Sequence, residues 1–294
     1  MIQKFLDYIS VEKRYSDHTV IGYRKDLIAF QEYLASRGKS NSIVDAKKKD
    51  IRGFLAFLSE NDYSKRSINR KLSTLRSFYL FLLRIGEISS SPMEGVSSLK
   101  VYPKKQIPFS REEMDYLADI SVNEDPDDQL GLLIVEVLYQ TGMRRSELIG
   151  LRIGDVDFSQ LQIKVYGKGG KERLIPIVEQ FAETLRSYLE EVRPDIEDED
   201  AFFLRSEGKK INEKFVYSRV KKYLSMVSSK EKISPHILRH SFATHVLGNG
   251  AEISKVKAIL GHASLASTQV YTHADIEQLK SVFNKAHPRA LKKK

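Results

Sequence analysis

The chain has 294 residues, of which 48 are Lys or Arg and 39 are Asp or Glu, giving a formal net charge of +9. This length predicts two domains, and an apolar fraction of 41% is enough for ordinary packed cores. The chain has no cysteine, which excludes disulfides, thiol nucleophiles and cysteine-based zinc sites. No apolar run approaches the roughly 20 residues that span a bilayer, and early acidic residues argue against a secretory signal. We expect a cytoplasmic protein with no membrane partner.

The positive charge is concentrated in the first third of the chain. Residues 1–100 hold 18 Lys or Arg against 11 Asp or Glu, whereas the rest of the chain is nearly balanced at 30 against 28. A modest excess also occurs on ordinary solvated surfaces. Its concentration in one third nevertheless favours an N-terminal region that binds a polyanion such as a nucleic acid.

Helical periodicity runs through the first hundred residues, and it predicts a helical domain over 1–97. The last helix of this region ends near Gly86 and carries a basic edge formed by Arg66, Arg70 and Lys71. A basic helix edge suits contacts to DNA phosphates, although each side chain alone also fits a solvated helix face. The predicted helical segments are 2–9, 19–35, 51–60 and 65–86.

Prolines, glycine and serines interrupt regular structure after this domain. We place a linker at 98–108, in which Lys104 and Lys105 can lie along a nucleic-acid backbone. The second domain, 109–294, is expected to be mostly helical with one small antiparallel sheet, so the fold class is mainly α. A Gly-rich turn flanked by alternating residues predicts a β-hairpin over 161–177. The other predicted segments are helices at 129–142, 178–192, 212–227, 234–250 and 253–261.

Two short motifs of the second domain place basic groups where they can reach a bound anion. In GMRRSEL, Arg144 follows a Gly-Met pair at a helix start, and Glu147 can orient its guanidinium. The bland alternative is a surface arginine pair, and the register leaves Arg145 as the other candidate. In YGKGGKER, Lys168 lies at the hairpin tip. This turn is not a phosphate-binding P-loop, because it joins two strands and lacks the required spacing.

Two further motifs contain histidines and a tyrosine. SPHILRHSFATH puts His236 and Arg239 on one helix face, three residues apart. LGHASLASTQVYTH has the pattern of a helix-turn-helix corner that reads DNA, yet its His262 and Tyr271 can also carry chemistry. A zinc site at the histidines of 236–245 is not expected, because the His-Glu-x-x-His arrangement is missing.

Taken together, these four motifs resemble the signature of tyrosine site-specific recombinases, the phage-integrase-like family, and most of all its bacterial Xer type. The resemblance covers nearly the whole chain. It implies a SAM-like, helical core-binding domain followed by a catalytic domain, with no cofactor and no metal. The matching positions are Arg144, Lys168, His236, Arg239, His262 and Tyr271.

The resemblance gives each matching residue a role. Arg144 and Arg239 clamp the non-bridging oxygens of the scissile phosphate, a task that suits a planar, permanently charged guanidinium. Tyr271 is the nucleophile, and a phenol with a pKa near 10 needs a base, for which His236 is the candidate. Lys168 protonates the departing 5′-oxygen. The remaining side chain, His262, hydrogen-bonds the phosphate.

The resemblance also implies partners and a process. The expected substrate is double-stranded DNA with a specific site, and the expected assembly is a homo- or hetero-tetramer on two duplexes that exchanges strands through a Holliday junction. A second Xer-type recombinase and a DNA-translocase activator are implied, with chromosome-dimer resolution near the nucleoid. Alternatives are a mobile-element integrase, a type IB topoisomerase or a DNA-reading module. Residues 275–294 are expected either to dock on a neighbouring protomer or to pack on their own chain.

Overall fold

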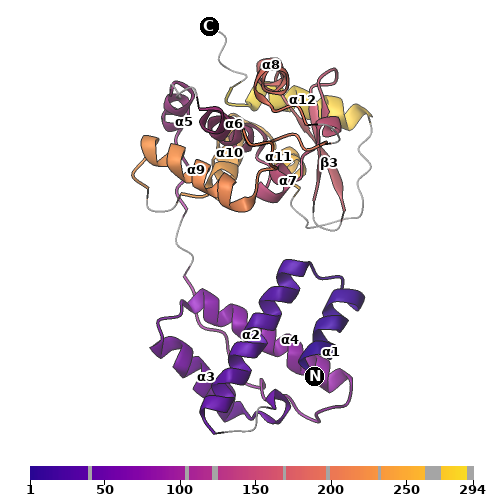
Figure 1. Cartoon of the computed structure of the whole chain (residues 1–294), viewed down its shortest axis with the longest axis vertical. Coiled ribbons are helices and arrows are strands. Elements are labelled where there is room, and N and C mark those ends of the chain that lie inside the picture. The colour runs from indigo at the N-terminus through magenta and orange to yellow at the C-terminus, as the bar shows by residue number, and fades with distance from the viewer. Residues whose placement is uncertain are drawn as a thin grey trace. The chain divides into compact units, whose positions relative to one another are not determined.

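The structure, a computed structural model, divides into two compact units, Met1–Lys104 and Lys105–Lys294 (Figure 1). Each unit has its own hydrophobic core. None of the described helices has the length and apolar character needed to cross a membrane. The residues that the structure describes are 1–38, 42–102, 106–120, 125–167, 170–196, 199–230, 233–261 and 273–289.

The N-terminal unit is built from helices, as its periodicity predicts. Its core contains large aromatic side chains such as Phe5, Phe30, Phe54, Phe78 and Tyr79, all at most 1% exposed. Burial of these rings on one face of each helix accounts for the helical spacing of the apolar residues. The elements are α1 (Ile2–Asp7), the π-helix η1 (Tyr8–Glu12), α2 (Asp17–Ser36), the 3₁₀-helix η2 (Ile43–Asp45), α3 (Lys48–Glu60) and α4 (Lys65–Arg84).

Part of the predicted basic edge of α4 lies inside the unit. The carboxylate of Asp26, on α2, is 1% exposed and accepts hydrogen bonds from Arg70 Nη1 at 2.5 Å and from Lys71 Nζ at 3.0 Å. The hydroxyl of Thr74 donates to the same carboxylate at 2.9 Å. The Lys71 side chain is buried, the Arg70 side chain is half exposed and Arg66 is exposed. The ammonium of Lys71 is thus engaged in joining α4 to α2, whereas Arg66 faces solvent.

The second unit is organised around α6, which is buried along most of its length and packs against α9 and α10. Ser110 accepts a hydrogen bond from the Glu113 N–H and the Glu113 carboxylate accepts one from the Ser110 N–H, which forms a capping box at the start of α5. The helices are α5 (Arg111–Ala118), α6 (Pro126–Thr141), α7 (Arg145–Ile149), η3 (Ile153–Asp155), α8 (Glu179–Ser187), the π-helix η4 (Tyr188–Val192), α9 (Glu213–Val227), α10 (Pro235–Gly248), α11 (Ile253–Leu260) and α12 (His273–Ala286).

The predicted hairpin forms two strands, β2 and β3, of a three-stranded antiparallel sheet in the order β1-β2-β3. The strands are β1 (Val156–Asp157), β2 (Gln162–Tyr166) and β3 (Glu172–Pro176). In the register between β2 and β3, Ile163 pairs with Ile175 and Val165 pairs with Arg173. Alternation therefore places Arg173 on the same buried face as Ile175, and both α11 and α12 contact β3.

The described part of the C-terminal segment packs on its own chain. Leu279, Phe283 and Ala286 of α12 are buried in the core of the second unit. His287 is fully buried, and its Nε2 lies 2.9 Å from the Gln140 carbonyl oxygen. After it, the Arg289 guanidinium binds Asp115 and Glu136 and lies over the Tyr139 ring. In the single chain, this stretch therefore takes the self-packed arrangement.

Removal of the buried carboxylate should destabilise the N-terminal unit. In Asp26→Ala, Lys71 is left buried without its anionic partner, so we expect the free energy of unfolding to fall by about 3–5 kcal/mol. Urea unfolding of the full chain measures the loss. The control Asp7→Ala, at an exposed position, should change stability by no more than about 0.5 kcal/mol. Replacing Lys71 by Met in the Asp26→Ala background should restore part of the loss, and unchanged stability of Asp26→Ala would contradict the pairing.

Acidification should loosen the C-terminal segment. Burial lowers the pKa of His287 from 6.5 to about 4, and the nearby Arg289 acts in the same direction. The unfolded chain therefore takes up this proton near pH 6.5 and the folded chain only near pH 4, so stability is complete above pH 6.5 and falls as the pH drops toward 4. Burial and Arg111 also lower the pKa of His245, which adds to the same slope.

The test is urea unfolding at pH 7.5, 6 and 5. Wild type should lose on the order of 2 kcal/mol across this range, and His287→Gln should reduce the slope. His240→Gln, at an exposed position on α10, is the control and should keep the wild-type slope. An identical slope in His287→Gln and wild type would rule out His287 as its source.

Candidate active site

Three of the six predicted site residues are described by the structure, and it brings two of them together. Arg144 and Arg239 converge at one end of α11, and His236 lies one helical turn before Arg239 on α10. The other three, Lys168, His262 and Tyr271, lie outside the described residues, as do the linker residues Lys104 and Lys105. Their roles stay predictions.

Arg144 is placed by the turn between α6 and α7. Gly142 ends α6 in the left-handed conformation, with φ of +62°, and Arg144 is the N-cap of α7. The Arg144 N–H donates to Glu147 Oε2 at 2.7 Å, and its Nη1 donates to Glu147 Oε1 at 2.7 Å. Glu147 is buried, so its carboxylate holds both the backbone and the side chain of Arg144. The predicted orienting contact is therefore present.

The structure separates the two adjacent arginines of this motif. Arg144 Nη2 donates to the Gly261 carbonyl oxygen at 2.9 Å, at the end of α11. Arg145 instead forms an ion pair with Glu213 of α9, with Nη2 and Oε2 2.8 Å apart. Arg144 therefore reaches the part of the site that contains Arg239, whereas Arg145 contacts α9.

Arg239 is held deep in the same region, with 9% of its surface exposed. Its Nη1 donates to the Gly142 carbonyl oxygen at 2.7 Å, and its Nη2 donates to the carbonyl oxygen of Leu260. A Cβ atom on Gly142 would lie 2.5 Å from the ring of Phe242, so only glycine brings this carbonyl close to the guanidinium. His236, in contrast, is exposed on the first turn of α10. An exposed imidazole can reach a group on a bound substrate.

Arg173 is part of this arrangement and was missed at the sequence level. Its Nη1 and Nη2 donate to the two oxygens of Glu147, each at 2.8 Å, and its Nε donates to the Ile259 carbonyl oxygen at 2.6 Å. The side chain is 6% exposed. A signal was available, because strand alternation puts this charged residue on the inner face of the hairpin beside Ile175. An inward-facing arginine requires a buried anionic partner.

Three guanidinium groups thus meet the C-terminal end of α11. Arg173, Arg239 and Arg144 donate to three successive carbonyl oxygens, those of residues 259, 260 and 261 respectively. The last carbonyls of a helix have no partner within the helix and carry partial negative charge. Gly261 adopts φ of +64°, the left-handed conformation typical of a glycine that ends a helix. The arginines therefore fix the point at which the chain continues toward His262.

The cluster carries more positive than negative charge. Burial by itself raises the pKa of Glu147, but the hydrogen bonds from Arg173 and Arg144 outweigh it and leave the pKa lowered. Glu147 is therefore ionised. Burial, followed by the charges of Arg144 and Arg173, lowers the pKa of Arg239 to about 10, so it remains protonated at neutral pH. Three cations around one carboxylate form a site with a net charge of +2, which suits an anion such as a phosphate.

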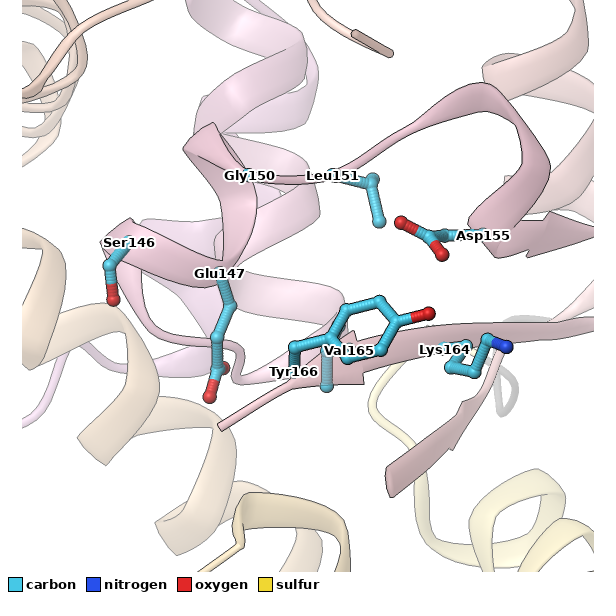
Figure 2. A pocket seen from close by; sticks show the side chains of 8 residues that line it. All are labelled: Ser146, Glu147, Gly150, Leu151, Asp155, Lys164, Val165 and Tyr166. Carbon is cyan, nitrogen blue, oxygen red and sulfur yellow. The ribbon is translucent and has the colours of Figure 1, made fainter. Parts of the chain in front are cut away.

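A small pocket lies between α7 and β2 and is lined in part by Glu147 (Figure 2). Its volume of about 50 Å³ is enough for a few water molecules. Figure 2 shows the Glu147 carboxylate turned away from Asp155, on the other side of the pocket. The pocket is therefore adjacent to the helical turn that contains Glu147. It is lined by Ser146, Glu147, Gly150, Leu151, Asp155, Lys164, Val165 and Tyr166.

Histidines and carboxylates do not gather into a metal-binding group of three or more anywhere in the described ranges. His245, on the helix considered above for zinc, is buried, and its Nδ1 lies 2.8 Å from the Tyr139 hydroxyl oxygen. The His245 ring is therefore a buried, hydrogen-bonded part of the second unit.

Both parts of the chain match known families. Residues 106–278 match the model of the phage integrase family, and residues 2–86 match that of the phage integrase N-terminal SAM-like domain. The chain is 37% identical over 302 residues to tyrosine recombinase XerC of Pelotomaculum thermopropionicum, covering 98% of each chain. It is 35% identical to tyrosine recombinase XerD of Lacticaseibacillus casei, covering 98% of this chain and 99% of the relative. Its fold is similar to that of XerH site-specific recombinase bound to difH substrate, with a TM-score of 0.68, 22% identity and coverage of 96% and 83%.

Proposed function

Because this chain belongs to the phage integrase family and is a tyrosine recombinase of the Xer type, we propose that it cleaves DNA at a phosphodiester held by Arg144 and Arg239. The observation that supports this assignment most directly is the cationic cluster at the end of α11. It combines a net charge of +2 with a position directly before the segment that carries His262 and Tyr271.

The two clamping arginines retain donors for a phosphate. Each guanidinium has five N–H donors, and the bonds described above use two nitrogens of Arg144 and two of Arg239. The Arg144 side chain is 36% exposed, so a strand of DNA can reach it. As negative charge grows on the non-bridging oxygens during attack, fixed guanidinium groups stabilise it without reorganisation.

The proposed chemical step is a transesterification. The Tyr271 hydroxyl attacks the scissile phosphorus while His236 accepts its proton, and the bond from phosphorus to the 5′-oxygen breaks. Lys168 protonates that oxygen, and His262 hydrogen-bonds the phosphate. The products are a 3′-phosphotyrosyl linkage and a free 5′-hydroxyl. A 5′-hydroxyl from a second duplex can reverse the step, so strands are exchanged without ATP.

We assign DNA binding to both units. The sequence division into a core-binding domain at 1–97, a linker at 98–108 and a catalytic domain at 109–294 supports a protein that holds duplex DNA with two parts. On α4, exposed Arg66 and half-exposed Arg70 can contact phosphates. Lys71 is used in the buried pair with Asp26, which favours a structural role.

The wider role follows from the relatives. Matches to XerC and XerD over nearly the whole chain favour a housekeeping recombinase over a mobile-element integrase or a type IB topoisomerase. We therefore propose resolution of chromosome dimers at a specific site, in a tetramer on two duplexes, through a Holliday junction. A second Xer-type recombinase and a DNA translocase are the proposed partners, in the cytoplasm at the nucleoid.

The nucleophile can be tested with a nicked suicide substrate. After cleavage, the short fragment that bears the free 5′-hydroxyl diffuses away, so religation cannot occur and the covalent product accumulates. Tyr271→Phe lacks the attacking oxygen but keeps the ring, so it should bind DNA and form no covalent adduct on a denaturing gel. Tyr217→Phe, at an exposed position on α9, is the control and should form the adduct. An adduct that persists in Tyr271→Phe would refute the assignment.

Variants of the adjacent residues Arg144 and Arg145 test which of the two arginines holds the phosphate. Arg144→Ala should slow adduct formation by about 100-fold or more, since one charge on the transition state is lost. Arg145→Ala removes only the ion pair with Glu213 and should stay within a few-fold of wild type. Both are measured in EDTA, in which wild type should remain active because guanidinium groups supply the charge. The reverse order of the two variants, or a strict metal requirement in wild type, would contradict the clamp.

A further inference from the structure

We propose that Arg173 is a positioning residue for strand cleavage, which acts on the scissile phosphate through Glu147 and Arg144 without touching it. This inference rests on the proposed function and adds to it a residue of the hairpin. It explains why a buried arginine occupies the inner face of β3, where strand alternation otherwise requires an apolar side chain.

All three nitrogens of the Arg173 guanidinium are engaged within the protein. Nη1 and Nη2 bind the Glu147 carboxylate and Nε binds the Ile259 carbonyl oxygen. At 6% exposure the group is also closed off from solvent. It therefore differs from Arg144, whose side chain is 36% exposed, and has no free face to offer a phosphate.

Both oxygens of the Glu147 carboxylate connect the two arginines. Glu147 Oε1 accepts from Arg173 Nη1 at 2.8 Å and from Arg144 Nη1 at 2.7 Å. The second oxygen, Oε2, accepts from Arg173 Nη2 and from the Arg144 N–H. The bidentate pairing fixes the plane of the carboxylate, and that plane in turn fixes the direction of the Arg144 guanidinium. A lysine at 173 is a point charge and cannot hold both oxygens.

Arg173 also joins two elements that adjoin segments with predicted catalytic residues. It lies on β3, directly after the Gly-rich turn that carries Lys168, and its Nε holds the last turn of α11, which precedes His262. The fit against this turn is close, because a Cβ on Gly261 would lie 3.0 Å from Arg173 Cδ. A misplacement of about 1 Å at a reacting centre is enough to cost roughly 100-fold in rate.

The experiment compares Arg173→Lys with wild type on two nicked suicide substrates of identical sequence. One has an ordinary scissile phosphodiester, and the other has a methylphosphonate, which lacks the negative charge that Arg144 neutralises. On the phosphodiester, Arg173→Lys should form adduct about 10- to 100-fold more slowly than wild type, with DNA affinity changed by less than about threefold. On the methylphosphonate, the two proteins should differ by less than about threefold, because a fully oriented Arg144 is no longer required.

A double-mutant cycle provides an independent readout on the ordinary substrate. Arg173→Lys should have little further effect in the Arg144→Lys background, because the guanidinium that it orients is gone. If Arg173→Lys does not fold, Glu147→Gln is the alternative variant, because it removes the charge through which Arg173 acts. It should also be slow on the phosphodiester and close to wild type on the methylphosphonate. The control is Arg193→Lys, since Arg193 binds the carbonyl oxygens of Glu199 and Ala201 away from the site. It should match wild type on both substrates.

The outcomes separate the two proposals. An equal rate defect on both substrates, with additive effects in the cycle, would show that Arg173 acts only on general stability, and the inference would be wrong. Failure of wild type to form any covalent adduct would refute the proposed function itself. A defect confined to the charged phosphate, in variants that melt near the wild-type temperature and bind DNA, would establish the positioning role.

Discussion

The pairing of the buried Glu147 carboxylate with Arg144 and Arg173 is the interaction on which the arrangement of the second unit depends. The carboxylate accepts hydrogen bonds from the side chain and backbone of Arg144 and from two nitrogens of Arg173. A carboxylate at this depth is tolerated only because cations surround it, and removal of either partner leaves an uncompensated charge. The same pairing ties the start of α7 to the inner face of the β-hairpin. Helix, hairpin and clamp are therefore positioned by one group.

The second constraint is the C-terminal end of α11, to which three other elements are bound. Its last carbonyl groups need donors from elsewhere in the fold. Arginines from β3, α7 and α10 supply them, so three elements far apart in sequence are fixed relative to the point where the chain leaves α11. The helix-turn-helix pattern in the sequence of 253–271 is compatible with this role of the α11 end as an anchor. The helix end that such a corner requires is also the surface on which the cationic groups assemble.

The sequence could predict what local patterns determine. Helical spacing placed the helices, alternation placed the hairpin, and the three-residue spacing of Arg144 and Glu147 predicted their contact. Long-range partners could not be predicted in this way. Arg70 and Lys71 follow Asp26 by more than 40 residues, so the basic edge of α4 gave no sign that part of it is neutralised inside the unit. The resemblance to recombinases named the residues expected to meet the phosphate. Strand alternation could have placed Arg173 on the inner face of the hairpin, but its partners Glu147 and Ile259 became visible only in the packing of the structure.

The site is assembled at an energetic cost in the free protein. The cluster contains three guanidinium groups and one carboxylate, and the lowered pKa of Arg239 reflects both burial and repulsion by Arg144 and Arg173. Backbone carbonyls relieve part of this cost, but they bear only partial charges. A phosphodiester held here as proposed would lower the net charge from +2 to +1, and the charge that develops during attack would lower it further. Under the proposed function, binding energy at this site would therefore grow along the reaction coordinate, which is the condition for an interaction to accelerate the step. A cluster that was already neutral would be more stable and would lack this property.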